Sequence, residues 1–265
     1  MHNTDHTTRF DENNYLFNPN SKCGIYLIHG FSSTTYEVKN LANFLADQGY
    51  CVKADNLPGH GTSIADCNSV TYIEWLSFVE QGIAEMYSHC NKVIIIGVSM
   101  GAVLALYSGT IFPVDGIVAA SAVFKFKNEF NVRVLNRLFH RFKYSVPKKS
   151  TFHPDKMKVA KINFYGYNQY PLYALNEMRK LVDYVKIKLH KISSPVLLMH
   201  STVDQTSPFE NFEIIKNQLN TNNLKTLIVD QTGHNMFDTD EDDKEEIFSS
   251  IDIFINNIFN NKINE

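Results

Sequence analysis

The sequence is poor in cysteine and has no long apolar run. Its four cysteines are widely spaced with no C-x-x-C pair, so their spacing indicates neither a disulfide framework nor a zinc site. No stretch approaches the roughly 18 apolar residues that a membrane-spanning helix needs. Residues 1–20 also lack the apolar centre of a signal peptide. We therefore expect a soluble protein of the cytoplasm.

Acidic residues are scarce in one part of the chain and basic residues in the other. Residues 122–193 hold 16 Lys and Arg against 4 Asp and Glu, whereas the remaining residues hold 9 against 24. The whole chain has 265 residues, 44% of them hydrophobic, and a net charge of −3. It is long enough to bury a substantial core. We expect a core built from residues 1–121 and 194–265, interrupted by a basic insertion at residues 122–193.

Short apolar runs alternate with amphipathic stretches along most of the chain. The apolar runs predict strands over residues 23–30, 50–55, 92–97, 116–122, 194–201 and 224–230. Helices are predicted over residues 34–49, 71–90, 100–112, 208–219 and 242–260. Apolar strands that alternate with helices form a parallel sheet covered on both faces. We therefore predict an α/β fold with a mostly parallel central sheet, which binds ligands at the carboxyl ends of its strands.

The pentapeptide from Gly97 to Gly101 contains Ser99 and joins a predicted strand to a predicted helix. A serine at such a junction sits on a sharp turn that lifts its hydroxyl clear of the sheet, and glycines on either side leave room for that turn. The alternative is a serine that only begins a helix at a tight helix–sheet contact. We predict that Ser99 is a nucleophile.

A serine nucleophile needs a base to accept its proton, and that base needs a third group to orient it. His234 and Asp204 each follow a predicted strand, which places both at the same sheet edge as Ser99. Asp230 and Asp238 lie close to His234 in the sequence and are rivals for the acid. The order serine, aspartate, histidine is the α/β-hydrolase order. We predict a triad of Ser99, Asp204 and His234.

Attack on an ester carbonyl creates an oxyanion that two backbone N–H groups must stabilise. The residue after the nucleophile, Met100, supplies one of them, and Phe31 in the loop after the first buried strand supplies the other. His29 and His60 stand in loops at the same sheet edge. We expect both histidines to organise those loops through hydrogen bonds rather than to take part in catalysis.

At this point the chain resembles a known family. The motifs LIHGFSSTTYEVKNLANFLADQGYCVKADNLPGHGTS, IIIGVSMGA, LLMHSTVDQTSP and DQTGHNMF together resemble the α/β-hydrolase branch of small bacterial carboxylesterases and monoacylglycerol-lipase-like enzymes. The resemblance covers about residues 23–260. It implies the α/β-hydrolase fold, the triad and oxyanion hole named above, and a helical cap formed by the insertion over the acyl pocket. Family members often lack two N-terminal strands, and here residues 15–17 are the one stretch that could add a strand.

The insertion contains an amphipathic segment, NVRVLNRLFHRFK. Its helical period places Val134, Leu135, Leu138, Phe139 and Phe142 on one face and Arg133, Arg137 and Arg141 on the other. In one interpretation the apolar face covers the active site and the charged face meets solvent. In the other, this basic helix meets an anionic membrane surface or an anionic acyl carrier. A second amphipathic stretch, residues 171–189, could complete the roof of the site.

These residues predict a serine hydrolase that cleaves carboxylic esters through an acyl-enzyme intermediate. Its substrates would be small-molecule esters or monoacylglycerols, and the reaction needs no metal and no organic cofactor. The alternatives are an acyl-CoA or acyl-carrier thioesterase, an acyltransferase, or a non-catalytic hydrolase-fold binding protein, because the triad alone does not distinguish the acyl acceptor. We expect no nucleic-acid partner.

Overall fold

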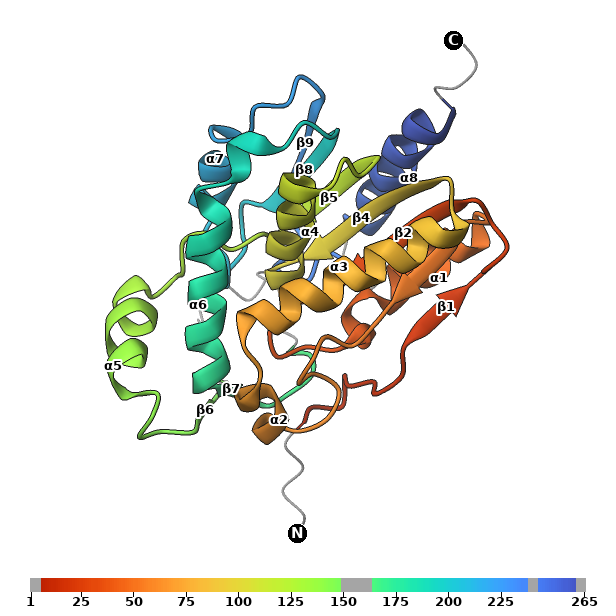
Figure 1. Cartoon of the computed structure of the whole chain (residues 1–265). Helices are drawn as coiled ribbons and strands as arrows, with labels where there is room; N and C mark the ends of the chain where they lie inside the picture. The colour runs from red at the N-terminus through yellow and green to blue at the C-terminus, as the bar shows by residue number, and fades with distance from the viewer. Residues whose placement is uncertain (1–5, 149–163, 238–242, 261–265) are drawn as a thin grey trace.

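A seven-stranded sheet forms the centre of the computed structural model (Figure 1), which describes residues 6–148, 164–237 and 243–260. Its strands are β1 (Tyr15–Phe17), β2 (Cys23–Ile28), β3 (Cys51–Ala54), β4 (Lys92–Val98), β5 (Gly116–Ala120), β8 (Val196–Ser201) and β9 (Leu224–Val229). The order across the sheet is β1-β3-β2-β4-β5-β8-β9. β1 pairs with β3 antiparallel and the other pairs are parallel. The predicted α/β fold with a mostly parallel sheet is confirmed.

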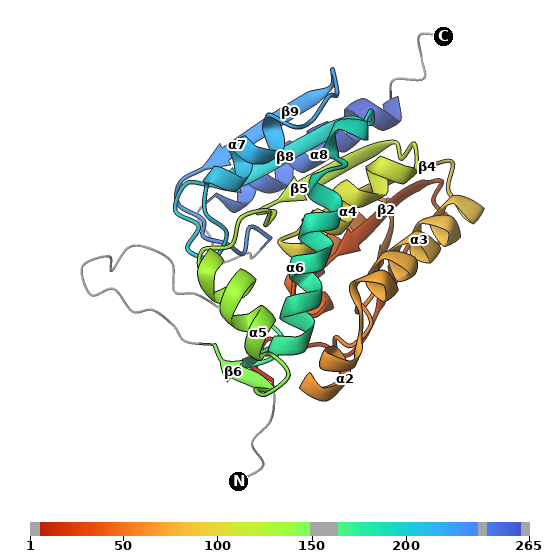
Figure 2. The ribbon, with the colours of Figure 1, turned by 60° about the vertical axis from the view of Figure 1, so that its left-hand side comes forward.

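Helices cover both faces of this sheet (Figures 1 and 2). One face carries α1 (Lys39–Asp47) and α8 (Lys244–Asn260), and the other carries α3 (Tyr72–His89), α4 (Met100–Ile111) and α6 (Leu172–Lys186). The shorter helices are α2 (Ile64–Ser69), α5 (Arg137–Phe139) and α7 (Glu210–Lys216). Each face therefore has its own apolar core, as alternating side chains of β2 illustrate: Ile25 and Leu27 point to one, Tyr26 and Ile28 to the other.

The predicted elements occur with small changes at their ends. The helix predicted over residues 34–49 begins as a 3-10 turn (Thr35–Val38) before α1, and the one predicted over 208–219 shortens to α7. α3 begins with a capping box, in which the Thr71 N–H donates to Glu74 Oε2 at 2.8 Å. The strand considered for residues 15–17 is β1. No helix within the described ranges is long and apolar enough to cross a membrane, and the cytoplasmic location stays a prediction.

The insertion, residues 122–193, leaves the sheet after β5 and returns before β8. It contains a helical segment (Asn131–Asn136, continued by α5), a two-stranded hairpin of β6 (Ser145–Pro147) with β7 (Gln169–Pro171), and α6. α6 contacts α2, α3 and α4, and its apolar residues belong to the same core as the sheet. A 3-10 turn at Leu189–Lys191 then leads back to β8. The base of the insertion is therefore part of the main core.

The amphipathic segment lies with its apolar face toward solvent. Leu138, Phe139 and Phe142 are 60%, 54% and 86% exposed. The interpretation that this face covers the active site is wrong. The opposite face is held to α6, where Arg133 pairs with Asp183 at 2.7 Å and the Asn136 amide donates to the Leu172 carbonyl at 3.0 Å. These polar contacts, together with the packing of Val132 against the core, hold the segment in this orientation.

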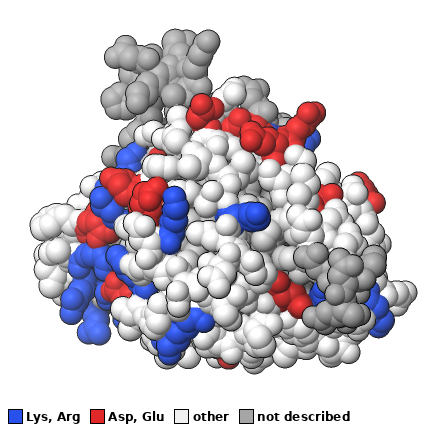
Figure 3. All heavy atoms as spheres, turned by 90° about the horizontal axis from the view of Figure 1, so that it is seen from above, with Lys and Arg blue, Asp and Glu red and all other residues white. Residues whose placement is uncertain are grey.

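Ion pairs connect many of the basic residues of the insertion with acidic neighbours. The pairs are Arg133–Asp183, Arg179–Asp183, Lys180–Glu177 and Lys125–Glu210, and Arg133 also pairs with Glu129. Seen from above (Figure 3), Lys and Arg gather at one side of the molecule with Asp and Glu among them. Four of these five pairs lie within residues 122–193, and of the five only Lys125–Glu210 joins the insertion to the rest of the chain. These pairs therefore leave the charge difference between the two parts of the chain almost unchanged.

Candidate active site

Ser99 occupies the sharp turn between β4 and α4. Its backbone angles are φ 57° and ψ −117°, a region that costs a residue with a side chain on the order of 1–3 kcal/mol. The turn is held by the Ser99 N–H, which donates to the Ala120 carbonyl of β5 at 2.9 Å. A Cβ atom on Gly97 would lie 2.1 Å from the Gly101 carbonyl oxygen. The absence of side chains at Gly97 and Gly101 therefore allows α4 to start close to the sheet, as the sequence predicted.

Asp204 and His234 are in direct contact. His234 Nδ1 lies 2.7 Å from Asp204 Oδ2, and the Asp204 side chain is fully buried. The other carboxylate oxygen accepts the N–H groups of Thr206 and Ser207 at 2.7 and 2.8 Å. These contacts fix the carboxylate and leave Nε2 as the free ring nitrogen of a neutral His234.

The charges of this pair support one another. Burial alone would raise the pKa of Asp204, but the attraction of His234 and the backbone hydrogen bonds together hold that pKa below its ordinary value. For His234, burial lowers the pKa, and the Asp204 carboxylate with its hydrogen bond, together with the charge of Glu37, raises it above its ordinary value. The imidazolium form that a general base must reach is therefore stabilised.

The acid assignment is supported by where its rivals lie. Asp230 is exposed at the end of β9, and Asp238 lies outside the described residues. A second histidine that the sequence analysis did not consider, His200, lies 3.8 Å from Asp204 Oδ2 and hydrogen-bonds the Ser207 carbonyl at 3.0 Å. Burial lowers the pKa of His200, so it stays neutral beside the carboxylate. His200 is the fifth residue of the buried strand β8 and lies four residues before Asp204. That position could have identified it from the sequence as a neighbour of the acid.

The loop after β2 holds Phe31, and the two predicted structural histidines organise it. The Ser32 N–H donates to His60 Nε2 at 3.1 Å, and the Leu57 N–H donates to His29 Nε2 at 3.0 Å. Burial lowers the pKa of His29 to about 4, so this ring is a neutral acceptor. The expectation of a structural role for both histidines is confirmed. The Met100 N–H is the first of α4, where N–H groups have no acceptor within the helix.

The buried carboxylate of Glu37 contacts the loop after β2. Glu37, which is 7% exposed, accepts the Gly30 N–H on Oε2 at 2.7 Å. A Cβ atom on Gly30 would lie 3.0 Å from this oxygen and 3.1 Å from Ser99 Cβ, so Gly30 is packed between the two side chains. Burial raises the pKa of Glu37 above its ordinary value. Sequence reasoning missed Glu37, because a glutamate at the start of an amphipathic helix is usually a solvent-facing residue.

The insertion is tied to the same loops. The Tyr167 N–H donates to the Ser32 carbonyl at 2.9 Å, and the Tyr167 hydroxyl donates to the Gly59 carbonyl at 2.8 Å. Gly166 has φ 68°, and a Cβ atom there would lie 2.2 Å from the Ser32 carbonyl oxygen. The insertion therefore rests directly on the loops that carry Phe31 and His60.

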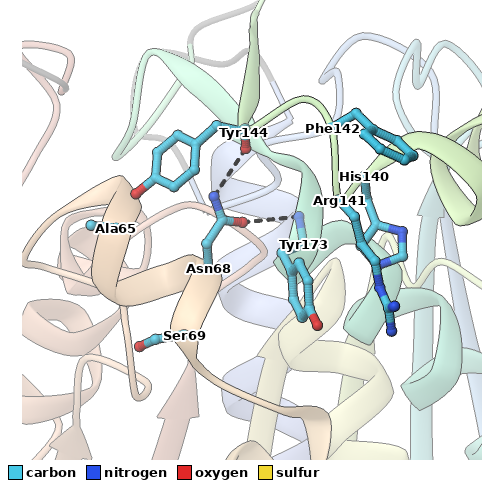
Figure 4. A pocket seen from close by; sticks show the side chains of 8 residues that line it. All are labelled: Ala65, Asn68, Ser69, His140, Arg141, Phe142, Tyr144 and Tyr173. Carbon is cyan, nitrogen blue, oxygen red and sulfur yellow. Dashed lines mark hydrogen bonds between the residues drawn. The ribbon is translucent and has the colours of Figure 1, made fainter.

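A cavity of about 590 Å³ opens between α2 and the insertion (Figure 4). Its lining residues are Ala65, Asn68, Ser69, His140, Arg141, Phe142, Tyr144 and Tyr173. The Asn68 amide bridges the two walls, since it donates to the Tyr144 carbonyl and accepts the Tyr173 N–H, both at 2.9 Å. Ser99, Asp204 and His234 are not among the lining residues, so this cavity is separate from the candidate catalytic residues.

Comparisons with known proteins agree with this fold. The family model described as "Serine aminopeptidase, S33" matches residues 19–242. A thermostable monoacylglycerol lipase from a Bacillus species is 29% identical over 197 residues, which cover 74% of this chain and 76% of the lipase. A carboxylesterase from Bacillus subtilis is 24% identical over 215 residues, or 79% and 83% of the two chains.

Among solved structures, one reported for LipS and LipT, two metagenome-derived lipolytic enzymes, superimposes with a TM-score of 0.80 at 22% identity. It covers 92% of this chain and 97% of its own. A monoacylglycerol lipase from Paleococcus ferrophilus gives a TM-score of 0.72 at 19% identity, with 92% and 98% covered. These two confirm the α/β-hydrolase fold. Because the family model matches most of this chain, the chain belongs to the S33 serine aminopeptidase family of α/β hydrolases.

Proposed function

We propose that this protein is a carboxylic ester hydrolase in which Ser99 is the nucleophile, His234 the general base and Asp204 the orienting acid. One observation carries the proposal: the 2.7 Å contact between His234 Nδ1 and Asp204 Oδ2, at the sheet edge where Ser99 sits in its strained turn. The lipase and carboxylesterase relatives support the ester class.

The reaction follows from these positions. His234 takes the proton of the Ser99 hydroxyl as Oγ attacks the ester carbonyl, and Asp204 stabilises the imidazolium that forms. The carbonyl oxygen becomes an oxyanion, which the N–H groups of Phe31 and Met100 stabilise. The imidazolium then protonates the departing alcohol and leaves an acyl-enzyme. Water, deprotonated by the same histidine, releases the acid and restores Ser99. None of these steps calls for a metal or an organic cofactor.

Small-molecule esters, monoacylglycerols among them, are the proposed substrates, and the insertion, residues 122–193, is the proposed cap. Two features support a cap. The contacts of Gly166 and Tyr167 join the insertion to the loop that carries Phe31. The aromatic rings of Phe31 and Trp75 pack edge to face beside that loop, with centroids 6.4 Å apart. The insertion therefore lies against the loop that carries Phe31, where a cap over Ser99 would have to sit.

A substrate panel tests this function. The full chain is assayed with p-nitrophenyl esters from acetate to palmitate, monoacylglycerols, acyl-CoAs and an amino acid p-nitroanilide. Turnover of the oxygen esters at the highest kcat/KM supports the proposal. A clear preference for acyl-CoA would identify a thioesterase or acyltransferase instead. Preference for the anilide would identify an aminopeptidase, and no turnover of any substrate would favour a binding protein.

We further propose that the cap meets an anionic membrane surface. Leu138, Phe139 and Phe142 are exposed, and Arg137 and Arg141 alternate with them along the chain. Exposed apolar side chains bordered by basic ones are typical of segments that lie in the membrane interface. An anionic acyl carrier is the alternative partner for this basic surface, and binding to such a carrier without binding to vesicles would favour it.

Vesicle sedimentation distinguishes specific membrane binding by this surface from nonspecific hydrophobic adsorption. The protein is expected to bind anionic vesicles, with binding reduced by added salt and by Phe142→Asp. Ile253→Asp is the matched control, because Ile253 is a 60% exposed apolar residue on α8. Salt-insensitive binding, or equal loss in both variants, would rule out the membrane surface while leaving the hydrolase assignment to the substrate panel.

A further inference from the structure

Two thiols and an imidazole converge at the end of the sheet opposite Ser99. Cys51 is the first residue of β3, His89 is the last residue of α3, and Cys90 caps that helix. Cys51 Sγ lies 3.9 Å from His89 Nε2, and the three possible ligand atoms all lie within 4.8 Å of one another. The fold therefore gathers three metal-ligating groups that are far apart in the sequence.

This cluster is not part of the catalytic machinery. Cys51 and Cys90 lie at the end of the sheet where β4 begins, and Ser99 follows the last residue of β4. A strand of that length spans about 20 Å at roughly 3.3 Å per residue. An ion bound at the cluster is therefore too far from Ser99 to contact a substrate there, and we expect it to affect the stability of the fold.

We propose that Cys51, His89 and Cys90 form a binding site for a thiophilic transition-metal ion of the Zn²⁺ type, with a fourth position open to solvent. Thiolate sulfur and imidazole nitrogen are the ligands that Zn²⁺ prefers. Neighbouring sulfur and nitrogen ligands of a tetrahedral ion lie roughly 3.5–3.8 Å apart, given bonds of about 2.3 Å to sulfur and 2.0 Å to nitrogen. The separations here, none above 4.8 Å, need a closure of roughly 1.3 Å or less to reach that geometry.

The hydrogen bonds of His89 favour the tautomer that a metal needs. The Ser88 hydroxyl donates to the Glu85 carbonyl at 2.7 Å, so its oxygen is left as an acceptor. His89 Nδ1 lies 3.3 Å from that oxygen. With the ring proton on Nδ1, the lone pair of Nε2 points to Cys51 Sγ. A ligating histidine usually donates its other ring N–H to an acceptor oxygen, and the Ser88 hydroxyl oxygen takes that place here.

The exposure of the three side chains also suits the binding of an ion. Cys51 is completely buried and Cys90 is 4% exposed, whereas His89 is partly exposed and opens the cluster to solvent. Thiols bind an ion as thiolates, so binding through Cys51 and Cys90 is expected to release two protons.

Cysteine spacing does not predict this site, because no two cysteines lie close together in the sequence. Here the paired ligands are a histidine and a cysteine next to each other, and the third comes from a strand almost forty residues earlier. The parallel pairing of β2 with β3, with Cys51 opposite Gly24, brings them together. A Cβ atom on Gly24 would lie 2.9 Å from Cys90 Sγ, so the missing side chain makes room for the thiol.

Cobalt titration tests the site on the full, reduced chain. One equivalent of Co²⁺ is expected to produce a thiolate-to-cobalt charge-transfer band that Zn²⁺ abolishes, with apparent affinity rising about a hundredfold per pH unit because two protons leave. Cys51→Ser and Cys90→Ser are expected to remove the band. His89→Ala, which changes a partly exposed side chain and leaves both buried thiols, is expected to weaken binding at least tenfold.

Cys23→Ser is the matched control, because Cys23 packs against the apolar cluster on the other face of the sheet. It is expected to bind Co²⁺ like the wild type. Esterase activity in each variant reports that the fold is intact, and Zn²⁺ is expected to raise the Tm of the wild type and not of His89→Ala. Absence of the band in the wild type, or a band that persists in Cys51→Ser, overturns the proposal.

Discussion

The Gly30 N–H donates a hydrogen bond to the buried Glu37 carboxylate at 2.7 Å, directly beside Ser99. This contact links two properties of the site. It fixes the backbone that presents the Phe31 N–H, and it places a negative charge where it raises the pKa of His234. In the proposed mechanism Glu37 takes no part in the bond changes, and we propose that it positions the loop and tunes His234.

The pH profile of Glu37→Gln reports on this role. A general base must be neutral, so wild-type kcat/KM is expected to rise with pH through a midpoint above 6.5, since the pKa of His234 is raised. Glutamine keeps an oxygen for the Gly30 N–H and removes the charge. The midpoint is therefore expected to move to lower pH.

Glu213→Gln is the control for this measurement, because it removes the same charge from an exposed position on α7. Its pH profile is expected to match the wild type. An unchanged midpoint in Glu37→Gln would show that the carboxylate does not tune His234. A fall in kcat at every pH, with no shift of the midpoint, would indicate that Glu37 only holds the loop.

Replacement of Ser99 by alanine tests the nucleophile. Ser99→Ala removes the attacking oxygen and is expected to abolish labelling by a fluorophosphonate and nearly all ester turnover. Ser108→Ala is the comparison, since Ser108 is also a buried serine of α4 whose hydroxyl bonds the Leu104 carbonyl. It is expected to label fully. Labelling that survives in Ser99→Ala would place the nucleophile elsewhere.

Replacement of Asp204 by asparagine tests the acid. Asparagine donates an N–H toward His234 Nδ1 and favours the wrong tautomer, so kcat is expected to fall by a factor of about 10⁴ if the serine-protease template applies. Asp230→Asn, at the nearby exposed rival, is expected to leave kcat within about twofold. Steady-state kinetics on a p-nitrophenyl ester measure both. A larger loss in Asp230→Asn than in Asp204→Asn would reverse the assignment.

What the sequence could predict depends on how local each signal is. Ser99 and its two glycines lie on five consecutive residues, and their turn follows from local sterics. Asp204 and His234 could be placed because parallel strands bring their carboxyl ends to one edge. Glu37 and His200 were missed, because their burial depends on loops from distant parts of the chain. The sequence left two orientations open for residues 131–143, since helical periodicity identifies an apolar face without saying what that face meets.

The last prediction concerns the approach of α4 to the sheet. A Cβ atom on Gly97 would meet the Gly101 carbonyl oxygen at 2.1 Å and the Ala102 nitrogen at 2.6 Å, and both are backbone atoms that cannot move aside without displacing α4. Gly97→Ala is therefore expected to lower the free energy of unfolding by about 4 kcal/mol or more, or to prevent folding. Gly49→Ala is the control, because a Cβ atom on Gly49 would have no other atom within 4 Å. Only the backbone strain at its φ of 87° should then lower the free energy of unfolding, by about 1–2 kcal/mol. Urea unfolding of both variants measures the difference. Equal stability in the two would mean that α4 can shift away from the sheet, and that the tight turn at Ser99 does not depend on this contact.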